Sequence, residues 1–419
     1  MSIFHFPHSV LAIEEKAQEG TKEAFGAVDT LVRENTRRLM EVFHQNRVSE
    51  QHFHETTGYG LGDRGREVLD NIYAQLFGGE EAYVRIGLVS GTHAITAALF
   101  GNLKPGETLL YVTGKPYDTL HGVIGLTGKH KGSLADYGIS YKQVDVLPCG
   151  SPDFAGIKEA LADKTVAMVA IQRSKGYANR KSWDIETIGG VNALVKEIRG
   201  DVPVFVDNCY GEFVETREPL HVGVDLIAGS LIKNPGGGLV PAGGYVAGRA
   251  DLVEGARNRA TAPGLLGEYG ANLGQNRLLY QGLFFAPHVV GQALKTAIFT
   301  AACMEEMGFM AEPSSKDRRT DIVQSIQFPN SELLCGFCEG IQAGAPVDSF
   351  VTPVPGEMPG YDSPVIMAAG AFHQGASIEL SADAPLREPY TAYLQGGLTF
   401  ESARLGVLTA VHKIQNSTF

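Results

Sequence analysis

A lysine and an aspartate each follow an apolar segment of this chain, and together they could do chemistry. Lys233 lies between the largely apolar residues 226–232 and the glycine block 236–238. Asp207 ends another apolar run, residues 203–206. A buried lysine can form a Schiff base with an aldehyde, and a carboxylate can keep a pyridine nitrogen protonated so that the ring accepts electrons. The pair therefore predicts a pyridoxal 5'-phosphate (PLP) site with Lys233 and Asp207 as catalytic residues.

The alternative for Lys233 is an exposed lysine in a surface loop. Its neighbours Leu231 and Ile232 and the glycines that follow argue against full exposure. Burial lowers the pKa of a lysine, which helps the amine to act as a nucleophile and a base. We therefore expect a lowered pKa for Lys233.

Residues suited to a phosphate and to an aromatic ring complete the predicted site. Ser90, Gly91 and Thr92 follow a predicted strand and open a predicted helix, where free N–H groups and the helix dipole favour an anion. Ser230 could donate its hydroxyl to the same phosphate. The ring of Tyr117 could stack on the pyridine, and its phenol could move protons. The structural alternatives are a capped turn and a core tyrosine.

Two further motifs carry little weight. His52 and His54 with His44 lack the cysteine or carboxylate pattern that would complete a metal site, so we expect no metal. Cys335 and Cys338 form a lone CxxC motif, which we interpret as core cysteines on a strand.

The elements that must position these residues alternate between strands and helices, which predicts an α/β fold. Such alternation is typical of a mostly parallel sheet sandwiched by helices. The site residues follow the carboxyl ends of the predicted strands, where sheets of this type bind ligands. The predicted strands are residues 83–89, 108–112, 141–146, 166–171, 204–207, 226–229 and 244–246.

Three segments are expected along the chain. Residues 1–56 form an N-terminal helical segment, with one or two helices between 10 and 45. Residues 57–288 form the large cofactor-binding domain. Residues 289–419 form a smaller α+β C-terminal domain, with a helix at 289–307 and strands near 348–351, 365–369 and 377–380.

Composition limits the class of protein. The chain has 419 residues, of which 44% are hydrophobic and 20% charged, as in ordinary globular proteins. A net charge of -12 makes a nucleic-acid partner unexpected, and no apolar run is long enough to span a membrane. Five cysteines and the lack of a signal-peptide pattern favour a cytoplasmic location.

These motifs resemble those of fold-type I PLP enzymes of the Cys/Met metabolism group. The branch they resemble most is the aluminium-resistance or methionine gamma-lyase-like family, which includes cystathionine beta-lyase assignments. The motifs that carry the resemblance are TGYG (57–60), VSGTHA (89–94), VDNCYGEF (206–213), SLIKNPGGG (230–238) and LREPY (386–390). The family lyases usually carry Ser-x-Thr-Lys, whereas Ile232 replaces the second hydroxyl here.

The resemblance implies roles for the residues already named. Lys233 would be the internal aldimine lysine, and Asp207 would bind the pyridine nitrogen. The remaining contacts to the phosphate and the ring would come from Gly91, Thr92, Ser230 and Tyr117.

Five further residues are implied by the resemblance alone. Tyr59 and Arg64 would reach the cofactor phosphate of a neighbouring subunit in a homodimer or homotetramer with shared sites. Arg387, with Arg404 as second candidate, would bind the substrate carboxylate, for which a planar guanidinium is suited. Arg173 is a candidate for the vicinity of the cofactor hydroxyl.

The implied activity is that of a carbon–sulfur lyase acting on cystathionine, methionine or cysteine. Elimination at the β or γ position would release a thiol, ammonia and a 2-oxo acid. A PLP-dependent aminotransferase or aldolase is one alternative. A regulatory protein that keeps the fold without catalysis is another, although the intact Lys233 and Asp207 argue against it.

Overall fold

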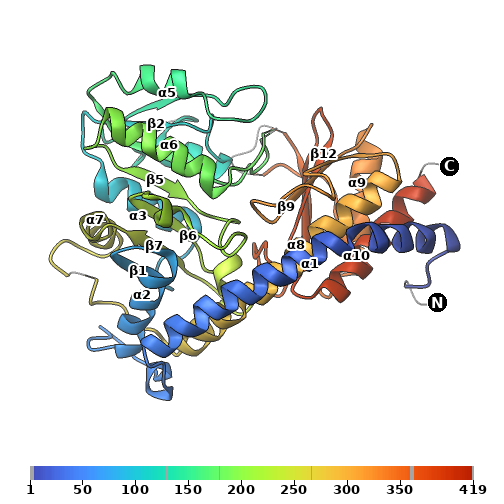
Figure 1. Ribbon diagram of the computed structural model, residues 1–419, viewed down its shortest axis with the longest axis horizontal. Helices are drawn as coiled ribbons and strands as arrows, with labels where there is room; N and C mark the ends of the chain where they lie inside the picture. The colour runs from blue at the N-terminus through green and yellow to red at the C-terminus, as the bar shows by residue number, and fades with distance from the viewer. Residues whose placement is uncertain (1–3, 129–130, 179, 266, 359–362, 418–419) are drawn as a thin grey trace. The chain divides into compact units, whose positions relative to one another are not determined.

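The chain forms two compact units (Figure 1). The computed structural model describes residues 4–128, 131–178, 180–265, 267–358 and 363–417. The larger unit comprises Thr36–Phe284, and the smaller unit combines Met1–Asn35 with Phe285–Phe419. These units differ from the predicted ranges 1–56, 57–288 and 289–419. The reason is that Val10 and Ala17 of the first helix are buried in the same core as Phe337 and Val411.

A seven-stranded sheet forms the centre of the larger unit, in the order β1-β7-β6-β5-β4-β2-β3. Neighbouring strands are parallel except at β7, which runs antiparallel to both β1 and β6. The predicted α/β fold is confirmed, and each strand overlaps a predicted one. The strands are β1 (Glu81–Arg85), β2 (Thr108–Tyr111), β3 (Ser140–Gln143), β4 (Val166–Gln172), β5 (Val204–Asp207), β6 (Leu226–Ser230) and β7 (Gly244–Gly248).

Helices cover both faces of this sheet. Successive side chains of a strand point to opposite faces, and both sets are buried here. Val246 belongs to the core beneath α3 (Gly91–Asn102) and α7 (Ala250–Ala260). The adjacent residue, Tyr245, faces the other side and packs on Tyr73 and Phe77 of α2 (Arg64–Phe77). The other helices of this unit are η1 (Glu50–Phe53), α4 (Asp118–Ile124), α5 (Phe154–Ala160), α6 (Ile185–Ile198), η2 (Pro219–Val222) and η3 (Asn234–Gly236).

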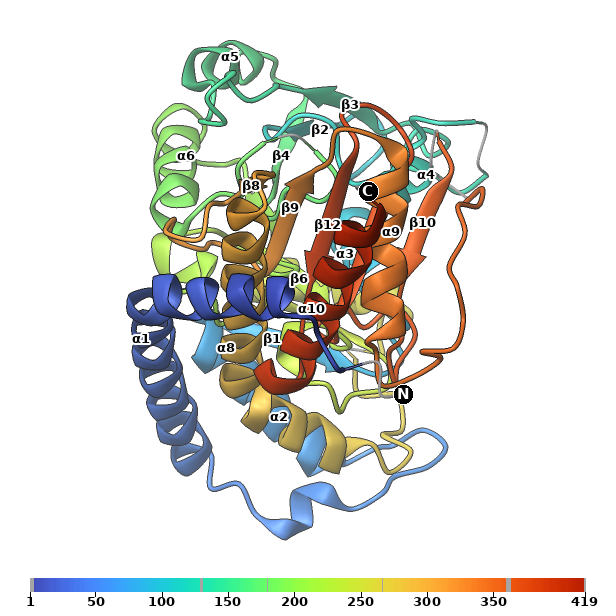
Figure 2. The ribbon, with the colours of Figure 1, turned by 90° about the vertical axis from the view of Figure 1, so that its right-hand side faces the viewer.

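The smaller unit contains a five-stranded antiparallel sheet, β10-β11-β12-β9-β8. Helices α9 and α10 pack against each other beside it (Figure 2). Its strands are β8 (Met310–Glu312), β9 (Val323–Gln327), β10 (Val365–Ala368), β11 (Ser381–Pro385) and β12 (Thr391–Gln395). Its helices are α9 (Ser331–Ala343) and α10 (Phe400–Ser417), while α1 (His8–Gln45) and α8 (Asn276–Glu306) contain residues of both units.

Several sequence predictions fail in this smaller unit. The predicted strands 348–351 and 377–380 are wrong, because the chain there forms turns and the nearby strand begins only at Ser381. Cys335 and Cys338 lie on helix α9 and not on a strand. Leu334, Phe337 and Ile341 are buried at helical spacing, and this periodicity could have indicated the helix.

Among the described residues, no helix is long and apolar enough to cross a membrane.

Candidate active site

The carboxyl ends of β4, β5 and β6 meet at one pocket of the larger unit. Asp207 ends β5, and Lys233 follows β6. The pocket measures about 290 Å³ when the space open to solvent is counted. Its described lining residues are Tyr117, Gln172, Ser174, Gly176, Asp207, Cys209, Tyr210 and Lys233. The structure thus brings together three of the residues that the sequence singles out: Lys233, Asp207 and Tyr117.

Lys233 is only partly buried, and its loop depends on the glycines that follow it. A Cβ at Gly236 would lie 1.8 Å from the carbonyl oxygen of Leu231, so no larger residue fits there. Nζ of Lys233 lies 4.0 Å from the centroid of the Tyr210 ring. The ammonium of Lys233 therefore contacts the face of the Tyr210 ring, and both residues line the pocket.

The predicted lowering of the Lys233 pKa is wrong. Burial does act to lower the pKa, but four neighbouring groups, Cys209, Tyr210, Asp207 and Glu212, raise it and outweigh burial. Negative charge near an ammonium favours its protonated form. Without a cofactor, Lys233 is therefore a cation at neutral pH.

Asp207 is buried at the end of β5. Its Oδ1 accepts a hydrogen bond from the backbone N–H of Cys209 at 3.1 Å. Burial raises the pKa of Asp207, and the positive charge of Lys233 acts in the opposite direction. A cation beside Asp207 would stabilise its charged form against the effect of burial, and a protonated pyridine nitrogen would be such a group.

The turn before α3 lies next to the end of β6. Ser90 caps the helix, since its Oγ accepts a hydrogen bond from the His93 N–H at 3.1 Å. A Cβ at Gly91 would lie 3.0 Å from Cβ of Ser230 and 3.5 Å from Sγ of Cys209. Only a residue without a side chain keeps this approach open, so Gly91 has a steric reason to be glycine.

The residues at this turn fit a phosphate. The Oγ of Ser230 is buried and has no hydrogen-bond partner. The first N–H groups of α3, including that of Thr92, have no acceptor within the helix. Thr92 Oγ1 lies 3.3 Å from Oγ1 of Thr119. An unsatisfied buried hydroxyl beside a helix N-terminus is an arrangement that an anion would complete.

Tyr117 is positioned by Gln172, a residue that the sequence analysis missed. The backbone N–H of Tyr117 donates to Oε1 of Gln172 at 2.7 Å, and Nε2 of Gln172 donates to the carbonyl of Ser174 at 2.9 Å. The Tyr117 ring meets Tyr177 edge-on, with centroids 5.8 Å apart. A polar side chain at the end of the otherwise apolar β4 was the available signal for Gln172.

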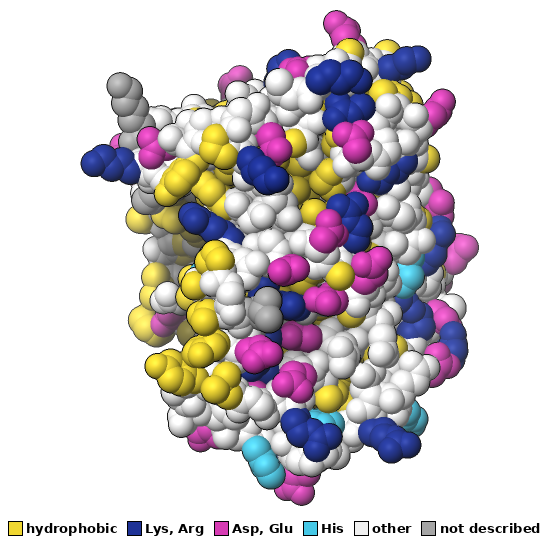
Figure 3. All heavy atoms as spheres, turned by 90° about the vertical axis from the view of Figure 1, so that its left-hand side faces the viewer, with side chains coloured by type: hydrophobic (Ala, Val, Ile, Leu, Met, Phe, Trp, Pro, Cys, Tyr) yellow, Lys and Arg dark blue, Asp and Glu magenta, His cyan; other side chains and the backbone are white. Residues whose placement is uncertain are grey.

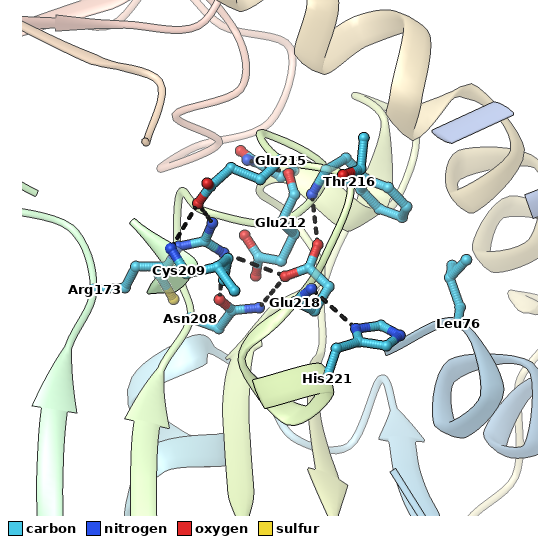
Figure 4. A network of polar contacts seen from close by, with 12 residues as sticks. Leu76, Arg173, Asn208, Cys209, Glu212, Glu215, Thr216, Glu218 and His221 are labelled. Carbon is cyan, nitrogen blue, oxygen red and sulfur yellow. Dashed lines mark hydrogen bonds and ion pairs between the residues drawn. The ribbon is translucent and has the colours of Figure 1, made fainter. Parts of the chain in front are cut away.

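Arg173 lies in a buried ion network (Figure 4). It is not one of the described residues that line the pocket. Its Nη2 is 2.9 Å from Oε2 of Glu215, and its Nη1 is 3.2 Å from Oε2 of Glu218. Nη1 also donates to Oδ1 of Asn208 at 2.9 Å. Because both terminal nitrogens bind these groups, the geometry favours a structural role over the predicted place near the cofactor hydroxyl.

The sequence profile of the methionine gamma-lyase family matches residues 10–415. The chain belongs to the methionine gamma-lyase family. It is 50% identical to the uncharacterized protein YnbB of Bacillus subtilis (strain 168), over 92% of each chain. A carbon-sulfur lyase involved in aluminum resistance from Clostridium novyi NT is 50% identical, with a TM-score of 0.94 over 98% of this chain and 97% of that one.

A structure from Listeria monocytogenes, named for an inferred cystathionine beta-lyase activity involved in aluminum resistance, is 48% identical with a TM-score of 0.94. The structural match covers 96% of this chain and 100% of the Listeria chain. The methionine gamma lyase CalE6 of Micromonospora echinospora shares the fold, with a TM-score of 0.55 and 20% identity. Family membership identifies the chain as a PLP-dependent lyase.

The two residues predicted to act between subunits lie on the surface. Tyr59 is 69% exposed, and its ring meets Tyr269 at a centroid distance of 5.0 Å. Arg64 is also exposed, at the first position of α2. Neither residue lines the described part of the pocket in its own chain.

The two predicted substrate arginines belong to the smaller unit. Arg387 is exposed and follows β11. Arg404 forms an ion pair with Glu14 and lies 3.6 Å from Oε2 of Glu401. Because the guanidinium of Arg404 already binds these carboxylates, Arg387 is the better candidate for binding the substrate carboxylate.

No group of three or more metal-ligating side chains gathers anywhere in the described parts of the chain.

Proposed function

We propose that the protein cleaves the carbon–sulfur bond of a sulfur-containing amino acid such as cystathionine, methionine or cysteine. The reaction is an elimination at the β or γ carbon that gives a thiol, ammonia and a 2-oxo acid. The observation that carries the proposal is the shared pocket of Lys233, Asp207 and Tyr117, with the unpartnered hydroxyl of Ser230 next to Gly91 at the start of α3.

PLP would supply an aldehyde for an amine and a ring that accepts the electrons of a deprotonated carbon. Asp207 would hold the proton on the ring nitrogen. A carboxylate and a cation about 4 Å apart attract by roughly 4 kcal/mol at an effective dielectric of 20. This attraction would also keep the buried Asp207 ionised against the effect of burial on its pKa.

Lys233 would bind the cofactor at rest and act as a base when it is free. Lys233 lines the pocket, and its amine, released uncharged when an amino acid takes its place on the cofactor, would take a proton from the substrate α-carbon and deliver it to another atom. The neighbouring groups Cys209, Tyr210, Asp207 and Glu212 raise the pKa of Lys233, which favours the ammonium that forms on this transfer. The ring of Tyr117 would orient the bound ring, since Gln172 fixes the backbone of this tyrosine.

The functional assembly would be a homodimer or homotetramer with shared sites. Exposed Tyr59, Leu61 and Leu273 support this assignment, because large apolar side chains on a surface favour association. Figure 3 shows hydrophobic side chains gathered along one edge of a face on which charged side chains are otherwise dispersed. Tyr59 and Arg64 would then contact the cofactor phosphate of the partner. All five cysteines are free, which favours the cytoplasm.

The first test is the 2-oxo acid released when the PLP-loaded protein meets L-cystathionine. Pyruvate indicates β-elimination and 2-oxobutyrate indicates γ-elimination. Borohydride reduction followed by peptide mapping should find the cofactor on Lys233, and the Lys233→Ala variant should lose this adduct. Amino transfer to an added 2-oxo acid, without release of a thiol, would instead support an aminotransferase.

A further inference from the structure

The chain makes a strained turn directly after Asp207. Tyr210 and Phe213 have backbone φ angles of 71° and 63°, in the left-handed region. The N–H of Gly211 donates to the carbonyl of Asn208 at 3.0 Å, so Tyr210 is the third residue of a four-residue turn. Glycine and asparagine suit a positive φ at this position, whereas a tyrosine persists there only if its surroundings impose it.

The buried ion network is hydrogen-bonded to this turn through Asn208 (Figure 4). Arg173 and Glu218 both bind the side chain of Asn208, at 2.9 and 3.1 Å. Oε1 of Glu218 accepts the N–H of Phe213 at 2.9 Å. A Cβ at Gly211 would lie 2.4 Å from Cδ of Arg173, so the turn rests directly on the arginine. Glu218 therefore binds both Asn208 at the start of the turn and Phe213 just after it.

The turn also contacts the lysine loop. Nδ2 of Asn234 donates to the carbonyl of Glu212 at 3.0 Å, which ties the residue after Lys233 to the turn. The ring of Tyr210 faces Nζ of Lys233 at 4.0 Å, and both residues line the pocket. An ammonium over the face of an aromatic ring is stabilised by the ring quadrupole.

We propose that Tyr210 is a positioning residue for Lys233, held in its strained turn by Arg173 and Glu218. Its ring face holds the free amine on one side of the pocket and favours the charged form. The other titratable groups that act on Lys233 are Cys209, Asp207 and Glu212. This inference rests on the proposed function for its relevance to catalysis, because that function makes Lys233 the cofactor lysine.

The test measures the reactivity of Lys233 in the protein without PLP. An amine-selective acylating reagent is applied over a range of pH, and peptide mass spectrometry gives the rate at Lys233 relative to the exposed Lys104. Tyr210→Phe keeps the ring face and removes only the phenol, so the relative rate should rise much less than in a variant without the ring. Tyr210→Leu removes the ring face, and the rate at a fixed pH should rise roughly two- to fivefold, with the pH profile moved to lower pH.

Tyr210→Asn is the second variant, since asparagine tolerates a positive φ and the variant should fold even if the leucine variant does not. It should show the same rise as Tyr210→Leu. Unchanged rates in a folded Tyr210→Asn variant would overturn the proposal, as would an equal rise in Tyr210→Phe. The readout uses no cofactor, so a failure of the proposed function would appear separately, as a borohydride adduct on another lysine.

Discussion

Replacing Arg173 with methionine should destabilise the larger unit strongly. Methionine has a similar length but no charge, so Glu215 and Glu218 would remain buried without their cation. Removing one partner of a buried ion pair costs about 3–5 kcal/mol. With a urea m-value of roughly 2–3 kcal/mol/M, the midpoint of unfolding should fall by about 1–2 M.

Fluorescence of the single tryptophan, Trp183, can follow unfolding near Arg173. Trp183 is buried, and its backbone N–H donates to the carbonyl of Arg173 at 3.1 Å. Its fluorescence therefore reports unfolding of the region that the substitution affects. Arg217→Met is the matched control, because Arg217 pairs with Glu186 at the surface, where such a pair contributes about 0–1 kcal/mol.

The decrease in the free energy of unfolding caused by Arg173→Met should depend on pH. Burial raises the pKa of Glu218 in the folded protein, and Arg173 lowers it. Without Arg173 the folded pKa moves further above the unfolded value, so protonation stabilises the variant. The deficit should be largest at high pH and should shrink as the pH falls through the folded pKa towards the usual glutamate range. A midpoint shift no larger than that of Arg217→Met at pH 8 would refute the assigned role of the network.

Three other substitutions have defined outcomes. Asp207→Asn should preserve the fold, as judged by circular dichroism, while turnover of L-cystathionine falls on the order of 100-fold, because the ring nitrogen loses its charged partner; unchanged kcat would remove Asp207 from this role. Ser230→Ala should leave stability nearly unchanged, since its buried hydroxyl has no partner in the protein, but should weaken PLP binding by about two- to tenfold in a spectroscopic titration. Burial raises the pKa of Glu212 from 4.5 to about 8, so its contribution to stability is lost as the pH rises between these values. In the Glu212→Gln variant the urea midpoint of unfolding should therefore fall less between pH 6 and 8 than in the unsubstituted protein. An equal fall in both proteins would show that Glu212 does not cause this pH dependence.

The position of a pocket residue could be predicted from the sequence where an apolar strand pattern ended in a polar residue. Asp207 and Lys233 follow clear apolar strands, and the carboxyl ends of parallel strands share one edge of a sheet. Ser90 and Gly91 similarly lie where a strand leads into a helix. In these cases local sequence and a general rule of sheet topology were sufficient to place the residues near one another.

Features that depend on distant residues were not predictable in the same way. The pKa of Lys233 depends on charges from the turn after β5, and burial alone gives the wrong direction. The ion network of Arg173 could not be predicted from the local sequence, because its glutamate partners lie 42 and 45 positions later in the chain. The N-terminal helix shares its core with Phe337 and Val411, which its own amphipathic pattern does not indicate.

The antiparallel position of β7 has a consequence for how the site assembles during folding. Lys233 lies in the connection between β6 and β7, which is closed by the pairing of Ser230 with Gly244 and by a hydrogen bond from Leu231 to Gly243. Closing the connection of residues 231–243 costs less chain entropy than bringing the turn at Gly91 to Ser230 from much earlier in the chain. The lysine loop thus depends on local contacts, whereas the approach of Gly91 to Ser230 depends on long-range contacts, so Lys233 and the turn at Gly91 come together only when the long-range topology is complete.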